Sequence, residues 1–186
     1  MASLFGHALV AVAIGRSYPR RTTSAGFYLL GALCAVIPDA DVVMFRLGVP
    51  YGHVLGHRGL SHSLLFALLL AGLVTRLFCR KDKLLSRAGL GYAFFCFACT
   101  ASHALLDAFT NGGLGAAAFA PFDNTRYFLP WRPIQVSPVG AGAFFSEWGL
   151  RVLKSEAIWI GIPCVCYILL AGLLRRRGTK SAARES

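Results

Sequence analysis

Five apolar runs separated by short polar segments dominate the pattern of the chain. They cover residues 4–15, 26–45, 60–78, 88–109 and 157–174. All but the first approach the roughly 20 residues that a helix needs to cross a lipid bilayer. The first run is shorter, so we expect it to span thinly, to tilt or to re-enter the membrane. The pattern predicts an all-α, polytopic membrane bundle of about five apolar helices.

Composition supports a membrane protein. Apolar residues make up 56% of the 186 residues and charged residues only 15%, which lies outside the usual range for a soluble domain. We expect one membrane-embedded domain over residues 1–174, followed by a basic cytoplasmic tail at 175–186. Residues 1–15 have no basic residue before their apolar stretch and carry a histidine within it, so we interpret them as part of the mature fold and not as a signal peptide.

Basic residues predict the orientation of the bundle. The net charge of +11 comes from clusters between apolar runs, a distribution that argues against nucleic-acid binding and reflects membrane topology. Lys and Arg collect on the cytoplasmic side of membranes. The residues that we place there are Arg16, Arg20, Arg21, Arg76, Arg80, Lys81, Lys83, Arg87, Arg175, Arg176, Arg177, Lys180 and Arg184. This distribution predicts five crossings of a bacterial cytoplasmic (inner) membrane, with the N-terminus outside and the C-terminus inside.

The long connection at residues 111–155 is expected at the outer membrane interface. It is rich in Gly, Pro and aromatic residues, and it contains Arg126 and Arg132. Aromatic rings prefer the headgroup level, so this segment is either a membrane anchor or a lid over a binding site. Residues 143–155 mix apolar and charged positions, a pattern typical of an interfacial helix. The six cysteines do not form a disulfide pattern, because five of them lie inside apolar runs.

Histidine and aspartate side chains from four segments converge in this topology. At about 1.5 Å of rise per residue, Asp39 and His103 each lie on the order of 20 Å above the cytoplasmic start of their runs, toward the outer face. His57 and His62 bracket the outer beginning of the third run, and His7 falls in the middle to outer part of the first. Ionisable groups in apolar segments are costly and usually functional. Imidazole and carboxylate together suit zinc and similar metals.

Local spacing suggests how these side chains are used. His103 and Asp107 share one helix face. Asp39 and Asp41 would point about 200° apart on a regular helix, so we assign Asp39 to the metal and Asp41 to a second ligand position or to orienting a ligand; Pro38 leaves the reverse open. Ser61 is a plausible N-cap, and a helix N-terminus would help to keep His62 neutral.

The motifs resemble a known family, the LexA-regulated membrane-bound metal-dependent hydrolases of the YdjM type. The matching strings are Pro38-Asp39-Ala40-Asp41, His57-Arg58-Gly59-Leu60-Ser61-His62-Ser63 and the spaced set His103, Asp107, Thr110 and Gly112, preceded by His7. The family is thought to be distantly similar to zinc-dependent phospholipase C. The resemblance implies that Asp39, His62 and His103 hold one metal, that Asp107 bridges, and that His7 serves a second.

The same resemblance implies a hydrolase with two divalent ions, Zn or alternatively Mn or Fe. The phospholipase group holds a third metal with an HxxxE pair, and none follows Asp107 here. Metal-bound hydroxide would attack a phosphoester or pyrophosphate of a lipid-like substrate at the outer leaflet. His57 would be a ligand or general acid, and Arg58, Arg126 and Arg132 are candidates to hold phosphate.

Two other functions fit the same residues. A metal-handling or transport protein would bind and pass a cation through these side chains, and a purely structural protein would use the histidines as helix caps. The sequence leaves the oligomeric state open.

Overall fold

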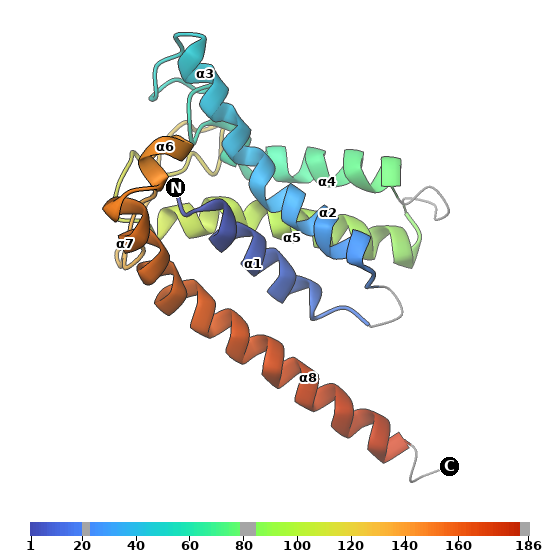
Figure 1. The fold of residues 1–186 in the computed structure, drawn as a ribbon. Coiled ribbons are helices and arrows are strands. Elements are labelled where there is room, and N and C mark those ends of the chain that lie inside the picture. Colours follow the sequence, from blue (N-terminus) through green and yellow to red (C-terminus); the bar gives the residue numbers. More distant parts are fainter. Residues whose placement is uncertain (20–22, 79–84, 183–186) are drawn as a thin grey trace.

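The computed structural model describes residues 1–19, 23–78 and 85–182 (Figure 1). Within these ranges the regular elements are helices, and the only β pairing consists of isolated bridges. Along the chain they are α1 (Leu4–Gly15), α2 (Ala25–Val36), the 3₁₀ helix η2 (Ile37–Val42), α3 (Val43–Arg46), the 3₁₀ helix η3 (Leu60–His62), α4 (Leu64–Phe78), α5 (Arg87–Ala108), α6 (Ala141–Phe144), α7 (Glu147–Glu156), the π segment η4 (Ala157–Gly161) and α8 (Ile162–Ala182). The all-α prediction is confirmed.

Serine side chains cap the beginning of several helices among the described residues. Each accepts a hydrogen bond from a backbone N–H of the first turn, and such a cap contributes about 1 kcal/mol. The capping residues are Ser3 in α1, Ser24 in α2, Ser86 in α5 and Ser146 in α7. These polar residues therefore set where the apolar runs become helical.

Within the part of the chain that the structure describes, three helical stretches are long and apolar enough to cross a membrane. They are Ala25–Arg46, Arg87–Ala108 and Glu147–Arg175, and α1 and α4 are shorter apolar helices. Large apolar side chains remain exposed on the outside of these helices, among them Leu68, Leu69 and Leu73 of α4. An exposed apolar surface of this extent fits contact with lipid.

The centre of the bundle is formed where α2 meets α5. The Phe27 and Phe95 rings stack with centroids 3.9 Å apart. Gly31 allows this close approach, because a Cβ there would lie 2.4 Å from Cζ of Phe95. Cys34 and Cys99 are buried in the same cluster, and the cysteines of the described residues are all free, as the sequence predicted. Cys79 lies outside the described residues.

The last span is longer than its sequence pattern suggested. Helix α7 occupies most of the segment expected as an interfacial helix at 143–155, and it runs through the π segment into α8 as one helical stretch. Pro163, which has no N–H to donate, lies two residues after the end of the π segment, where the hydrogen-bond ladder is already shifted. Helix α8 then continues to Ala182, into the segment expected as a tail.

The helix ends separate into two groups (Figure 1). One end of the bundle holds the end of α1, the start of α2, the end of α4 and the start of α5, while α3, α6 and the long loops gather at the opposite end. Helix α8 diverges from the others toward its C-terminus. Several basic residues used to predict orientation lie outside the described residues, namely Arg20, Arg21, Arg80, Lys81, Lys83 and Arg184.

Candidate metal centre

Four separate elements bring the predicted histidines and aspartates together at the end of the bundle that holds the long loops. His7 comes from α1, Asp39 from η2, His62 from η3, and His103 and Asp107 from the last turns of α5. These five side chains are all buried, and His7, His103 and Asp107 are 0% exposed. The convergence expected from topology is therefore present in the fold.

Four of these residues have the spacing of ligands around one ion. Nε2 of His62, Nε2 of His103 and one carboxylate oxygen each of Asp39 and Asp107 lie within 4.8 Å of one another. The Nε2 atoms of the two histidines are 3.0 Å apart. Oδ1 of Asp39 lies 3.2 Å from His103 and 3.6 Å from His62, and Oδ2 of Asp107 lies 3.5 Å from His62 and 3.9 Å from His103.

These separations match a tetrahedral coordination shell. Zinc bonds of 2.0–2.2 Å to nitrogen and oxygen require ligand atoms about 3.3 to 3.6 Å apart at the edges of a tetrahedron. Five of the six edges are given above, and they scatter around that value. The four residues therefore fit a divalent ion such as zinc.

Both histidines are oriented for this role by their second nitrogen. Nδ1 of His103 lies 2.6 Å from the Ala35 carbonyl oxygen. A carbonyl only accepts, so His103 donates from Nδ1 and leaves the Nε2 lone pair facing the cluster. Nδ1 of His62 lies 3.2 Å from Oδ2 of Asp41. Such partners fix the ring orientation of metal-bound histidines.

Asp39 and Asp41 approach the same histidine from opposite sides of its ring. The expectation that they point about 200° apart assumed an α-helix. They lie instead in a 3₁₀ helix with Pro38 in its first turn, where three residues per turn reduce the angle between them, measured the short way round, from about 160° to about 120°. Asp39 faces Nε2 of His62 and Asp41 faces Nδ1, so Asp41 orients a ligand and Asp39 is placed to be one.

Asp41 collects several hydrogen bonds from the segment that follows it. Its carboxylate accepts from Nδ1 of His57 at 2.6 Å and from the backbone N–H of Arg58 at 3.1 Å. The Ser61 hydroxyl also donates to it. Asp41, His57 and His62 have metal-ligand spacing as well, but the Asp41 oxygens are already occupied by these donors. The group is therefore best described as a His57–Asp41 pair beside the main cluster.

Replacing Asp41 by Asn should loosen His62 without removing a ligand. We expect Asp41→Asn to weaken metal affinity by about 10- to 100-fold, the usual cost of losing such a partner. Competition with a fluorescent zinc chelator measures this change. Asp123→Asn is the matched control, since Asp123 bonds only Thr125 and Tyr127 on the surface. Equal affinity of both variants would contradict the role assigned to Asp41.

Arg58 is an internal residue that contacts Asp107, and its predicted role in holding phosphate stays a prediction. Its side chain is 0% exposed. Nε lies 2.9 Å from Oδ2 of Asp107, and the terminal nitrogens donate to the Gly112 carbonyl and the Thr110 hydroxyl. Arg58 has φ 62°, the left-handed region, and Gly59 follows where a Cβ would lie 2.1 Å from the Val54 carbonyl oxygen. The turn aims the guanidinium inward, where it positions Asp107.

Arg126 also holds the loops together. Its guanidinium donates to the backbone carbonyls of His57, Tyr51 and His53 and so braces this loop; its predicted role as a phosphate ligand stays a prediction. Arg132 is exposed and lies over the Phe128 ring, 4.7 Å from its centroid. His53, which the sequence left without a partner, is exposed and accepts from Leu55 N–H.

His7 lies on the other side of Asp107 from His62. Its ring stacks on His103 at 3.7 Å, and its Nε2 is 3.7 Å from Oδ1 of Asp107. Neither ring nitrogen has a hydrogen-bond partner, although both are buried. Asp107 thus presents Oδ2 to the four-residue cluster, whereas Oδ1 faces His7 and accepts a hydrogen bond from the Ala2 N–H at 2.8 Å.

The start of α4 and the electrostatics around His62 differ from the expectation. Ser63 caps the helix through Phe66 N–H, and His62 lies before it in η3. Burial alone would lower the pKa of His62, but hydrogen bonds with Asp107, Asp39 and Asp41 raise it to about 10. The carboxylates outweigh the helix N-terminus that was expected to keep this imidazole neutral. The cluster therefore strongly favours a positive charge at its centre.

Glu156 was missed as a residue that supports the site. It is 5% exposed, and its carboxylate accepts from the Ser3 backbone N–H and hydroxyl. This contact anchors the beginning of α1, the helix that carries His7. Ser3 and Glu156 are 153 residues apart, so no local motif signals the pair.

Apolar helices that close on a buried cluster of histidine and aspartate define a membrane protein with a candidate metal centre. The chain belongs to the YdjM inner membrane protein family, whose model matches residues 1–178. It is 36% identical over 180 residues to "Inner membrane protein YbcI" of Escherichia coli (strain K12), covering 95% of this chain and 100% of that protein. No solved structure matches the chain significantly. The YdjM resemblance is confirmed, whereas the wider likeness to phospholipase C stays a prediction.

Proposed function

We propose that the protein is a metal-dependent hydrolase that cleaves a phosphoester or pyrophosphate of a lipid-like substrate. The observation that carries this proposal is the tetrahedral spacing of Asp39, His62, His103 and Asp107 at buried positions. The class of reaction follows the family resemblance together with the neighbouring His57–Asp41 pair.

Charge balance supports a bound cation. Asp39, Asp41 and Asp107 place three carboxylates in the site, and Asp107 faces two cations, the Arg58 guanidinium at 2.9 Å and the Met1 ammonium at 4.0 Å. Burying uncompensated carboxylates is costly. Zinc suits this set of nitrogen and oxygen ligands, with Mn or Fe as alternatives. A second ion would lie between His7 and Oδ1 of Asp107, which gives the proposed count of two.

The residues around the cluster can manage a proton. When bound, the metals supply a hydroxide near neutral pH and stabilise charge on the phosphate oxygens. His57 donates from Nδ1 to Asp41 across 2.6 Å, which leaves its Nε2 able to accept or release a proton. Arg58 holds Asp107 in place, and Arg132 is the exposed cation on the neighbouring loop that could meet an anionic headgroup.

The end of the bundle that holds the metal cluster is proposed to face the outside of the bacterial inner membrane. Arg16, Arg76 and Arg87 lie at helix ends opposite the cluster, and basic residues favour the cytoplasmic side. The E. coli relative is named an inner membrane protein. Five crossings would then place the cluster near the outer leaflet.

Proteoliposomes test hydrolysis against transport. Purified protein is reconstituted with phosphatidylglycerol, phosphatidic acid and a lipid pyrophosphate, and released phosphate compounds are measured by mass spectrometry. We expect release that stops with EDTA and returns with Zn²⁺. Zinc flux into the same vesicles without any lipid cleavage would overturn the hydrolase proposal and favour cation transport.

A further inference from the structure

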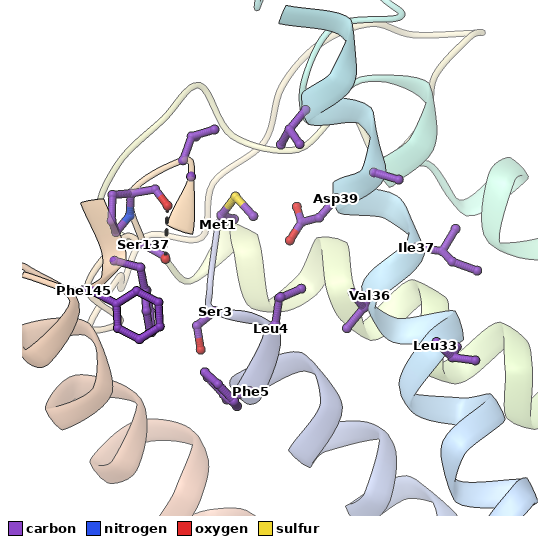
Figure 2. A pocket seen from close by; sticks show the side chains of 16 residues that line it. Met1, Ser3, Leu4, Phe5, Leu33, Val36, Ile37, Asp39, Ser137 and Phe145 are labelled. Atoms are coloured by element: carbon purple, nitrogen blue, oxygen red, sulfur yellow. Dashed lines mark hydrogen bonds between the residues drawn. The ribbon is translucent and has the colours of Figure 1, made fainter. Parts of the chain in front are cut away.

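An apolar cavity of about 610 Å³ lies directly beside the metal cluster. It is formed between the start of α1, the end of α2 with η2, and the segment around α6 (Figure 2). Its size falls within the range of about 300 to 1,000 Å³ that is usual for small-molecule sites. The residues that line it include Leu4, Phe5, Val36 and Phe145.

The cavity has one charged wall. Asp39 is the only ionisable side chain among its lining residues, and the lining hydroxyl of Ser3 is bonded to Glu156. Figure 2 shows the Asp39 carboxylate pointing from η2 toward Met1. Oδ1 of Asp39 contacts the cluster histidines, whereas Oδ2 is buried and has no hydrogen-bond partner. Asp39 is therefore the boundary between an apolar cavity and the candidate metal centre.

The cavity opens where the protein is expected to meet lipid. Leu4, Phe5 and Phe145 at its walls are 52%, 66% and 86% exposed. Such side chains offer no donors or acceptors to a peptide backbone, whose polar groups must be satisfied when buried. A hydrocarbon chain needs none, so it is the occupant that matches this lining.

We propose that the cavity binds one acyl chain of a membrane glycerophospholipid. Because the charged wall belongs to the metal cluster, a chain in the cavity would bring the attached phosphate to the ions. This placement of the phosphate rests on the proposed function, whereas binding of the chain does not. The cavity would thus select a lipid phosphate over a soluble one.

Photolabelling in lipid nanodiscs tests this binding. The probe is phosphatidylglycerol with a diazirine near the end of one acyl chain, and labelled residues are located by mass spectrometry. We expect more label on the residues of the cavity walls than on the lipid-facing side of α8. Filling the cavity with Leu4→Trp or Val36→Trp should remove most of that label. Leu29→Trp and Val43→Trp are controls, because both residues are exposed on the Ala25–Arg46 stretch that also holds Val36 and neither lines the cavity.

The outcomes separate the cavity from the chemistry. Label spread evenly over the exposed helices, label unchanged by both cavity-filling variants, or cross-links to a second copy of the chain would each overturn the proposal. Should one tryptophan variant fail to fold, the label distribution on the wild-type protein still decides. Concentrated label without any lipid cleavage would support the cavity and count against the hydrolase.

Discussion

Replacing His103 by Ala is expected to abolish lipid hydrolysis and to remove the bound metal. His103 contributes Nε2 to the cluster, 3.0 Å from the matching nitrogen of His62 and 3.2 Å from Asp39. Its loss removes a ligand and leaves three carboxylates with one imidazole fewer. Loss of a group that only orients a metal ligand lowers metal affinity by about 10- to 100-fold. We expect the loss of the ligand His103 itself to lower the affinity further. Chelator competition and the liposome assay measure the two effects.

His53→Ala is the matched control for this variant. His53 is also a histidine of the same chain, but it lies exposed in a loop, and its ring accepts a hydrogen bond from the Leu55 N–H. We expect wild-type metal affinity and activity. If His103→Ala kept both properties while His53→Ala lost them, the assignment of the cluster would be wrong.

Replacing Arg58 by Met should cause the largest loss of stability. The guanidinium is fully buried and bonds Asp107, Thr110 and Gly112 at once. Removing one partner of a buried ion pair costs about 3–5 kcal/mol, because the other charge stays buried without its partner. For a chain of this size, that corresponds to a Tm lower by about 6 to 20 °C. Thermal unfolding in detergent followed by circular dichroism measures the shift.

Two further substitutions show whether geometry or charge is responsible. Arg58→Lys keeps the charge, but one ammonium group cannot reproduce the planar fork that reaches three acceptors, so we expect only partial recovery of the Tm. Arg132→Met removes an exposed arginine and should stay within about 0.5 kcal/mol of the wild type. A wild-type Tm for Arg58→Met would show that the buried contacts of Arg58 are not needed.

Features that depend on period and charge were predictable from the sequence. Each of the five apolar runs contains a helix, and the spacing of His103 and Asp107 places both on one face of α5. The sequence also predicted that basic residues lie at one end of the bundle and the clustered histidines at the other, since the length of the helices sets this distance. The spacing of residues on a helix and the position of the basic residues were therefore enough to predict that His62, Asp39, His103 and Asp107 come together.

The remaining features depend on local backbone geometry or on distant contacts. Asp41 reaches His62 because η2 is a 3₁₀ helix, and Arg58 points inward because of its left-handed backbone. Neither conformation follows from hydrophobic periodicity. The Ser3–Glu156 contact joins the beginning of α1 to the end of α7, 153 residues apart, and the π segment that connects α7 with α8 has no pattern of its own.

The most direct test of the central claim is the metal content of the purified protein. Inductively coupled plasma mass spectrometry on protein in detergent, prepared without added metal, should find at least one zinc, manganese or iron ion per chain. The same preparation of a double variant, His62→Ala with His103→Ala, should contain none above background. Folded wild-type protein that holds no divalent metal, even after incubation with Zn²⁺ and desalting, would contradict a metal centre formed by Asp39, His62, His103 and Asp107.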